Sequence, residues 1–550
     1  MKPLAALGLV LPLLCSGCAS HRATNTAPAT TAAAPSIAHI QILGFNDFHG
    51  ALLPPSGATG HIGGVDAGGV EFFATHLARL RAENPNTIVV SAGDNIGASP
   101  LLSGMFHDEP TVEALSAAGL QISTVGNHEF DEGWQELRRL QNGGCHPVDG
   151  CQDKTPFAGA GFEYLSANVV VDAAFQTLFP ATTVKVVDGV KVGFIGLALQ
   201  GTPAIVMPQF LRGLTFRPEV AAGNEAAAAL VAQGVKTIVV LIHAGGRPAT
   251  NDPNGCDITG AIIDIATRLS PDIDVVVSGH THRAYICTIG TKLVTSAESN
   301  GNLITAIDLG IDRATGDVVS KRARNVIVTR DIAKTAALTG LLDHYRPFYT
   351  ALGQRRIGSI ITPILEAANA DGESTLGDLI ADAMLEQTAA AAAGGAQVAL
   401  WNNGGIRADL IGEPPVSPGG PAVIAFTHAF DVLPFGNRVE LRTITGASLI
   451  AMLGTGAFQV SRGLSYTYDA TRPRGQRADP GTVKLWDRVI DPAARIRVAT
   501  SDFIWNGGDD MPVVEGTDRL DVGLDIDLFV AYLETHSPVQ PGPQNRISRK

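Results

Sequence analysis

The stretch His39–Phe45 (HIQILGF), followed at once by Asn46-Asp47-Phe48-His49-Gly50, indicates how this chain folds. An apolar, β-branched run of this length is typical of a buried strand, and polar residues begin where the run ends. The same pattern recurs over residues 37–330. The further runs are Thr87–Ser91, Ile122–Val125, Val190–Leu197, Thr237–Ile242 and Ile273–Ser278.

Helical stretches separate several of these runs, among them Glu71–Glu83 and Pro218–Gln233. Strands that alternate with helices are the signature of layered α/β domains. We therefore predict one α/β domain over residues 37–330.

The pattern changes after this domain. Residues 331–355 are predicted to form a connecting helix, and residues 356–550 a second domain. In the second domain we expect a helix from Thr375 to Ala393, which Gly394-Gly395 would end, and then a strand, Gln397–Trp401.

The composition limits the possible partners. The chain has 550 residues, 45% of them hydrophobic and 17% charged, which fits a folded protein of more than one domain. Its formal net charge of −13 argues against a nucleic-acid duplex as partner, because duplex binding needs a basic surface. Small anionic substrates remain compatible with this charge where metal cations dominate the local field.

The N-terminus has the pattern of an export signal. Lys2 precedes an apolar run, Leu4–Leu14, that is too short to span a bilayer, so residues 1–18 are predicted to be a signal peptide. Cys18 after Ser16-Gly17 resembles a bacterial lipoprotein acylation site. We expect an exported protein, either periplasmic or anchored to the outer membrane by a lipid at Cys18. Residues 19–36, rich in Ala, Thr and Pro, are expected to be a flexible tether.

Four cysteines follow the signal region: Cys145, Cys151, Cys256 and Cys287. An even number in an exported chain indicates disulfides, although the sequence does not decide their pairing. We favour Cys145–Cys151 and Cys256–Cys287; buried free thiols are the alternative.

Side chains that bind metals follow five of the predicted strands. Ligands bind at the carboxyl ends of strands in α/β sheets, so these distant residues are expected to converge. Each motif alone is more often a solvated turn, and the interpretation depends on their conjunction. The motifs are Asn46-Asp47-Phe48-His49-Gly50, Gly93-Asp94, Gly126-Asn127-His128-Glu129-Phe130-Asp131, His243 and Gly279-His280-Thr281-His282.

Carboxylates and imidazoles together suit a pair of divalent cations such as Zn²⁺, Mn²⁺ or Co²⁺. Two such ions clamp a phosphoryl group and activate a water. Asp94 stands alone between pairs of ligands and is therefore the candidate for the residue that bridges both ions. Alternation along an extended segment predicts that Asp47 and His49 point to the same side, as do His280 and His282.

The order of these motifs resembles the calcineurin-like metallophosphoesterases, and the forms Asn-Asp-Phe-His-Gly and Gly-Asn-His-Glu-Phe-Asp resemble the 5′-nucleotidase family within them. The resemblance implies a four-layered α/β/β/α sandwich. It also implies one metal held by Asp47, His49, Asp94 and His282, and another by Asp94, Asn127, His243 and His280. His128, oriented by Asp131, would then stabilise the transition state or assist the leaving group.

The second half carries further stretches that resemble this family. They are Asn402-Asn403-Gly404-Gly405-Ile406-Arg407, Leu433-Pro434-Phe435-Gly436-Asn437 and Asp502-Phe503-Ile504-Trp505-Asn506-Gly507-Gly508-Asp509. The resemblance implies a nucleoside-binding domain in which Phe435 and Phe503 sandwich the base. Asn402 and Asp509 would bond base or ribose, and Arg407 phosphate or ribose. Gly372 stands where family members often carry an arginine, which would remove a phosphate contact.

The resemblance implies a metal-dependent hydrolase of 5′-nucleotidase type that acts on small nucleotides. A 2′,3′-cyclic-nucleotide phosphodiesterase with 3′-nucleotidase activity, or a nucleotide-sugar pyrophosphatase, is compatible with the same metal site. The non-enzymatic alternative is an exported nucleotide-binding protein with structural metals.

Overall fold

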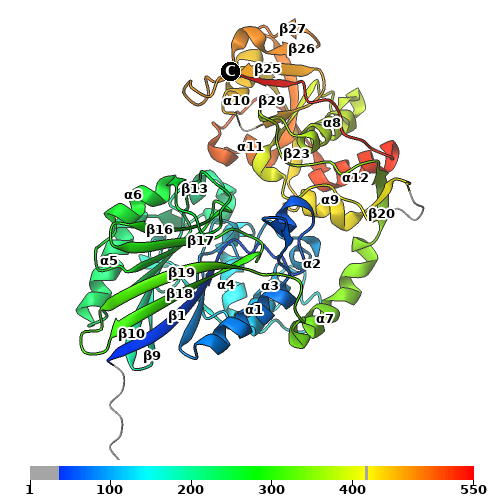
Figure 1. Ribbon diagram of the computed structural model, residues 1–550. Coiled ribbons are helices and arrows are strands. Elements are labelled where there is room, and N and C mark those ends of the chain that lie inside the picture. Colours follow the sequence, from blue (N-terminus) through cyan, green and yellow to red (C-terminus); the bar gives the residue numbers. More distant parts are fainter. Residues whose placement is uncertain (1–35, 415–418, 457) are drawn as a thin grey trace, which may run out of the picture. The chain divides into compact units, whose positions relative to one another are not determined.

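The computed structural model describes residues 36–414, 419–456 and 458–550 (Figure 1). The predicted signal peptide, the acylation site at Cys18 and all but the last residue of the predicted tether lie outside the described residues. Within the described ranges, no helix is both long enough and apolar enough to cross a membrane.

The first six-stranded sheet contains β1 (Ile37–Phe45), the strand that opens the pattern in the sequence. β1 pairs in parallel with β4 (Thr87–Ser91), and β5 (Ile122–Thr124) and β6 (Glu163–Leu165) continue in parallel. On the other side of β1 lies β18 (Leu303–Asp312), which is antiparallel to β1. β19 (Val318–Ile327) follows at the sheet edge and is antiparallel to β18. The carboxyl ends of β1, β4 and β5 therefore meet at one edge.

The second six-stranded sheet has the order β16-β17-β15-β12-β10-β9. β10 (Val190–Leu197) and β12 (Thr237–Ile242) have the predicted bounds, whereas β15 (Val275–Ser278) begins two residues after the predicted Ile273. These three strands run parallel, so the ends of β12 and β15 share an edge. The remaining strands are β9 (Thr182–Val187), β16 (Ala284–Ile289) and β17 (Lys292–Ala297).

Three apolar cores separate four layers. Ile42 and Val90 of the first sheet pack with Phe194 and Val239 of the second between the two sheets. Helices α1 (Val70–Glu83), α3 (Glu109–Ala118) and α7 (Ala336–Gly353) share a core with the outer face of the first sheet. Helices α5 (Glu219–Ala232) and α6 (Ala261–Arg268) share a core with the outer face of the second sheet. The predicted α/β/β/α order is confirmed.

The C-terminal part has a core of its own, with Trp401, Leu441 and Phe529 in it. Its five-stranded sheet has the order β24-β21-β28-β23-β29 and packs against α8 (Thr375–Ala389) and α12 (Asp525–His536). The strands are β21 (Val398–Asn402), β23 (Arg438–Thr445), β24 (Phe458–Val460), β28 (Arg495–Ser501) and β29 (Thr517–Leu524). This is the separate α/β domain that the sequence predicts.

Shorter elements complete both parts. The helices are α2 (Leu101–Gly104), α4 (Trp134–Asn142), α9 (Phe426–Val432), α10 (Gly446–Leu453) and α11 (Asp502–Trp505). The strands are β2 (His61–Ile62), β3 (Val65–Asp66), β7 (Val169–Val171), β8 (Gln176–Thr177), β11 (Leu214–Phe216), β13 (Arg247–Pro248), β14 (Ile258–Thr259), β20 (Arg356–Ile360), β22 (Ala422–Ala425), β25 (Leu464–Tyr468), β26 (Lys484–Leu485), β27 (Arg488–Val489) and β30 (Ile547–Arg549).

The largest errors in the predicted helix bounds are at the start of α7 and the end of α8. α7 begins at Ala336 rather than at Asp331, because Thr335 has an extended backbone (φ −77°, ψ 115°) and its N–H donates to Glu71 O. α8 ends at Ala389, because Ala390 is extended, and residues 391–393 form a separate 3₁₀ turn. The structure pairs Cys145 with Cys151 and Cys256 with Cys287, as we favoured.

The two sheets approach each other closely at Gly196 in β10. A Cβ at this position would lie 2.5 Å from both Cβ and O of Leu165 in β6. Since backbone atoms cannot yield easily, Gly196→Ala should lower the free energy of unfolding by about 1–3 kcal/mol. Thermal or urea unfolding measures this change.

The matched control is Gly340→Ala in α7, where an added Cβ meets nothing within 4 Å. This change should leave stability unchanged or raise it by up to about 1 kcal/mol, since alanine favours helix over glycine. Equal effects of the two substitutions would contradict the close approach of the sheets.

Candidate metal centre

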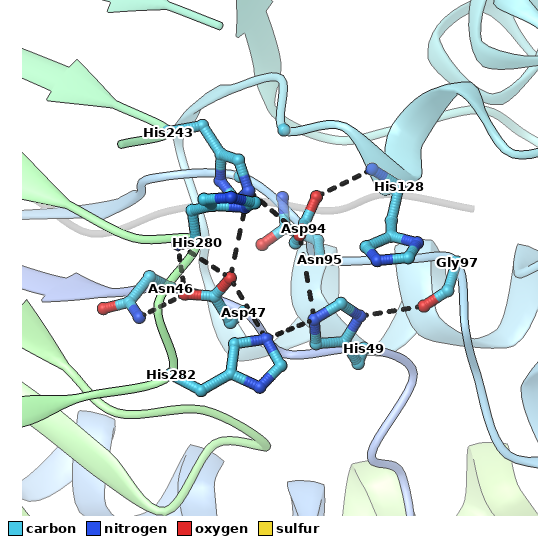
Figure 2. Close-up of polar contacts among 12 residues, drawn as sticks. Asn46, Asp47, His49, Asp94, Asn95, Gly97, His128, His243, His280 and His282 are labelled. Carbon is cyan, nitrogen blue, oxygen red and sulfur yellow. Dashed lines mark hydrogen bonds and ion pairs between the residues drawn. The ribbon is translucent and has the colours of Figure 1, made fainter. Parts of the chain in front are cut away.

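The predicted metal ligands lie in the loops that follow five parallel strands, β1, β4 and β5 of one sheet and β12 and β15 of the other. Six of them fall into neighbouring groups of three whose ligand atoms lie within 4.8 Å of one another, one of which includes His128, and Figure 2 shows them facing a common space. The six are Asp47, His49, Asp94, His243, His280 and His282. The seventh, Asn127, is buried next to His128, whose N–H donates to Asp94 Oδ1 at 2.9 Å.

The first group consists of Asp47, His49 and His282. The Nε2 atoms of His49 and His282 lie 3.0 Å apart, and His282 Nε2 lies 3.6 Å from Asp47 Oδ1. Two imidazole nitrogens and one carboxylate oxygen therefore point at one another, as ligands of a common cation do.

Asp94 lies between this group and a second one. Its Oδ2 is 3.8 Å from His49 Nε2 and 2.9 Å from His243 Nε2, and His280 completes the second group. Asp94 thus lies within reach of both groups, and its role as a ligand shared by two ions stays a prediction.

Hydrogen bonds to backbone carbonyls fix the orientation of two imidazoles. His49 Nδ1 donates to Gly97 O and His243 Nδ1 to Ala92 O, each at 2.9 Å. The Nε2 atom of each ring is then the one directed into the cluster, where a metal ion would take the place of any proton on it. Such outer contacts are typical of metal-binding histidines.

The donor set fits divalent cations. Asn127 Oδ1 and His243 Nε2 are buried and have no hydrogen-bond partner among the described residues, although His243 Nε2 forms an ion pair with Asp94. Burial raises the pKa of Asp47 to about 7, and the neighbouring Asp94 adds to this. Burial lowers the pKa of His243, but the charges of Asp94 and Asp47 and the hydrogen bonds to Asp94 and Ala92 O together outweigh burial and raise this pKa to about 10. The buried carboxylates thus favour protonation within the cluster. Bound metal cations can supply the same positive charge in place of these protons.

Five of the ligands have a left-handed backbone. The φ angles are 51° for Asp47, 48° for His49, 50° for Asp94, 75° for His280 and 51° for His282. This conformation is unfavourable for residues with a Cβ and is concentrated at functional sites. It corrects one step of the sequence argument: Asp47 and His49 converge through a tight loop after β1, and not through alternation along a strand.

His128 and Asp131 form the predicted pair, with His128 Nδ1 and Asp131 Oδ2 2.7 Å apart. Burial lowers the pKa of His128, but the charges of Asp131 and Asp94 outweigh burial and raise it. The imidazole is therefore held in place and favoured in its protonated form, which can donate to a developing negative charge.

Glu129 is a residue of the site that the sequence argument did not single out. Its buried carboxylate accepts hydrogen bonds from the N–H groups of Gly126 (2.6 Å), Asp94 (2.8 Å) and Asn95 (2.9 Å). It thereby joins the loop after β4 to the loop after β5. Its place beside Asn127-His128 was visible in the sequence, but its backbone partners were not.

The predicted substrate residues lie in the C-terminal domain. Asn402 Nδ2 donates to Asp509 Oδ2 at 2.8 Å, which brings these two residues together. The Phe435 ring stacks on His128 with centroids 5.8 Å apart, and the Arg407 guanidinium lies 5.8 Å from the Phe435 centroid. The Phe503 ring lies against Gly508, where an added Cβ would collide with it.

The fold and this cluster are those of metal-dependent phosphoester hydrolases. The model of the calcineurin-like phosphoesterases matches residues 40–284, and that of the 5′-nucleotidase C-terminal domain matches residues 356–516. The chain belongs to the 5′-nucleotidase family, whose N-terminal domain is of this calcineurin-like type and uses divalent metals.

Three individual proteins show how far the similarity extends. The chain is 31% identical to cell wall protein Lmo0130 of Listeria monocytogenes, over 96% of this chain and 69% of that protein. It is 32% identical to endonuclease YhcR of Bacillus subtilis over 84% of this chain, but spans only 37% of that longer protein. The 5′-nucleotidase precursor of Thermus thermophilus has a similar structure, with a TM-score of 0.76 and 26% identity over 93% of this chain and 99% of that chain.

Glu129→Gln tests how this carboxylate positions the ligands. The amide can accept only at its oxygen, so at least one of the three N–H groups loses its acceptor and the loop that carries Asp94 shifts. We expect metal affinity or kcat to fall about 10- to 100-fold, as for other outer contacts of metal sites. Activity measured against Mn²⁺ concentration gives both values.

Glu163→Gln is the control, because Glu163 is exposed and its carboxylate pairs only with Lys185 in the described structure. It should keep wild-type metal dependence. Wild-type behaviour of Glu129→Gln would show that the three N–H groups do not need the charged acceptor.

Proposed function

We propose that the chain is an exported phosphoesterase with two metal ions that hydrolyses nucleotide phosphate esters to nucleoside and phosphate. The observation that carries the proposal is the position of Asp94 between two groups of histidines, 3.8 Å from His49 and 2.9 Å from His243. A carboxylate in this position can serve two ions at once. The loaded metals would be Zn²⁺, Mn²⁺ or Co²⁺.

Bound metals would supply Lewis-acid stabilisation of the phosphoryl oxygens and a water acidified to a pKa of about 7. Asp47, His49, Asp94 and His282 would hold one ion, and Asp94, Asn127, His243 and His280 the other. His128 stands beside this cluster with Asp131 on its Nδ1, so its Nε2 is available to donate to the phosphate or to the leaving oxygen. The nucleoside oxygen leaves as an alcohol after it receives a proton.

The C-terminal domain would hold the nucleoside. Phe435 and Phe503 offer aromatic faces to the base, and stacking on such faces contributes roughly 1–3 kcal/mol per base by alanine substitution. Asn402 and Asp509 would bond base or ribose. Arg407 has a forked guanidinium, which suits phosphate or ribose oxygens.

Export is supported by the two disulfides, Cys145–Cys151 and Cys256–Cys287, since such bonds persist in oxidising compartments. We propose a signal peptide over residues 1–18, with either a free periplasmic form or a lipid anchor at Cys18. The proposed domain borders are 37–330 for the metallophosphoesterase domain and 356–550 for the substrate domain.

A panel of phosphate esters tests the reaction. We expect phosphate release from AMP that stops after treatment with EDTA and returns with Mn²⁺, Zn²⁺ or Co²⁺. Preference for 3′-AMP, cyclic nucleotides or UDP-glucose would instead select the 3′-nucleotidase or pyrophosphatase alternative. DNA belongs in the panel, because one relative is named an endonuclease.

Asp94→Asn provides the control in the same assay. This variant should lose both turnover and a bound metal while it keeps the circular dichroism spectrum of the wild type. Full activity of Asp94→Asn would rule out the shared ligand, and EDTA-resistant activity would rule out metal catalysis. Tight nucleotide binding without turnover of any ester would favour the non-enzymatic alternative.

The double substitution Phe435→Ala/Phe503→Ala tests the aromatic clamp. Each lost stacking contact weakens nucleoside binding, so KM for AMP should rise at least tenfold. KM for p-nitrophenyl phosphate should change far less, because this substrate carries no base. Steady-state kinetics on both substrates give the two KM values. An equal rise in KM for both substrates would contradict the aromatic clamp.

A further inference from the structure

A second group of histidine and carboxylate side chains lies outside the candidate metal centre, on segments that flank α3 and α4. Ligand atoms of His107, Glu132, Glu136 and His146 all lie within 4.8 Å of one another. His107 precedes α3, Glu132 precedes α4, Glu136 lies in the first turn of α4, and His146 follows that helix. Three of the four side chains are largely buried, with 16%, 8% and 15% of their surface exposed for His107, Glu136 and His146.

The two imidazoles face each other and share a carboxylate. The rings of His107 and His146 stack with centroids 3.8 Å apart and planes at 16°. Asp149 Oδ2 lies 3.0 Å from His107 Nε2 and 3.3 Å from His146 Nδ1. A carboxylate on the outer nitrogen of a histidine is the usual device that orients a metal-binding imidazole.

The other nitrogen of each ring points toward the glutamates. His107 Nδ1 is 2.6 Å from Glu132 Oε2, and His146 Nε2 is 4.0 Å from Glu136 Oε2. Tetrahedral Zn²⁺ with ligand distances of about 2.0–2.2 Å requires donor atoms about 3.3–3.5 Å apart. The two observed separations lie on either side of this value, so binding requires the side chains to move, and the two rings to leave their parallel stack so that a nitrogen of each faces the ion.

The negative charge of the cluster also favours a bound cation. Glu132, Glu136 and Asp149 face the imidazoles, and Arg139 is divided between Glu136 and Glu109. His107 Nδ1 lies 2.6 Å from Glu132 Oε2 and His107 Nε2 lies 3.0 Å from Asp149 Oδ2, so carboxylates face both nitrogens of this ring. A divalent cation among these donors would offset the charge of the facing carboxylates.

We propose that His107, His146, Glu132 and Glu136 bind a divalent cation of the Zn²⁺ type, with Asp149 orienting both imidazoles. Binding releases the Nδ1 proton of His107. At His146, Nδ1 accepts from the backbone N–H of Asp149 at 3.1 Å, and on binding it would instead donate to the Asp149 carboxylate. Four protein ligands saturate the ion, which makes this a structural site and not a second catalytic one.

The position of this site defines what the metal would stabilise. His146 and Asp149 lie within the loop that the Cys145–Cys151 disulfide closes. Next to His107, Asp108 Oδ2 accepts from the N–H of Gly97 at 2.9 Å, and the carbonyl of Gly97 accepts from His49. The metal would thus fix the loop after α4 to the start of α3, beside a segment that supports the candidate metal centre.

Metal content tests the proposal without recourse to activity. The chain is stripped with EDTA, reloaded with Zn²⁺, dialysed and analysed by inductively coupled plasma mass spectrometry. His107→Gln/His146→Gln should contain one equivalent less than the wild type and should show a smaller rise in Tm on addition of Zn²⁺. His61→Gln is the matched control, because His61 is an exposed histidine that pairs with Asp66 at 2.8 Å; it should keep full metal content.

The same comparison is made in an Asp47→Asn/Asp94→Asn background, which lacks both carboxylates of the candidate metal centre. In this background, too, the His107→Gln/His146→Gln variant should contain one equivalent of Zn²⁺ less. The result therefore does not depend on whether the proposed function is correct. Glu132→Gln, at a half-exposed ligand, should weaken Zn²⁺ binding at least tenfold without a change in fold. Equal Zn²⁺ content and affinity in the variants and the wild type would overturn the proposal.

Discussion

The neutralisation of two buried carboxylates, Asp47 and Asp94, is the constraint on which the arrangement of this protein depends. Both are almost fully buried, and a buried carboxylate is costly unless it is paired. The carboxylates lie after β1 and β4 of one sheet, whereas His243 and His280 lie after β12 and β15 of the other. The cluster therefore needs both sheets in register, and the apolar core between the sheets provides that register.

Backbone strain follows from the same constraint. Asp47, His49 and Asp94 have positive φ angles, and such conformations cost roughly 1–3 kcal/mol each unless the surroundings impose them. Glu129 is one source of this support, because its carboxylate accepts from the N–H groups of Asp94, Asn95 and Gly126. The rigid sheets thus position a site whose loops would not adopt this shape alone.

Much of this organisation could be predicted from the sequence, for physical reasons that differ between elements. Buried parallel strands such as Thr87–Ser91 and Thr237–Ile242 are continuous apolar runs, so their bounds were predicted correctly. β19 was missed because it pairs at the sheet edge with many exposed positions and a charged sequence. The convergence of Asp47 with His282 followed from strand ends that share an edge. The left-handed backbone and the contacts of Glu129 depend on loop geometry, which no local pattern encodes.

The two clusters of histidines and carboxylates differ in a way that their chemistry explains. In the candidate metal centre, His128 lies beside His49 and Asp94 and has Asp131 on its Nδ1, so its other ring nitrogen is not held by this carboxylate. In the cluster around His107, both imidazoles have Asp149 on one side and a glutamate on the other, so carboxylates face the nitrogens of both rings. Gly97 connects them, since its N–H binds Asp108 and its carbonyl binds His49. A cation that orders the start of α3 would therefore reach the candidate metal centre through Gly97 and His49, and its loss should affect stability before it affects chemistry.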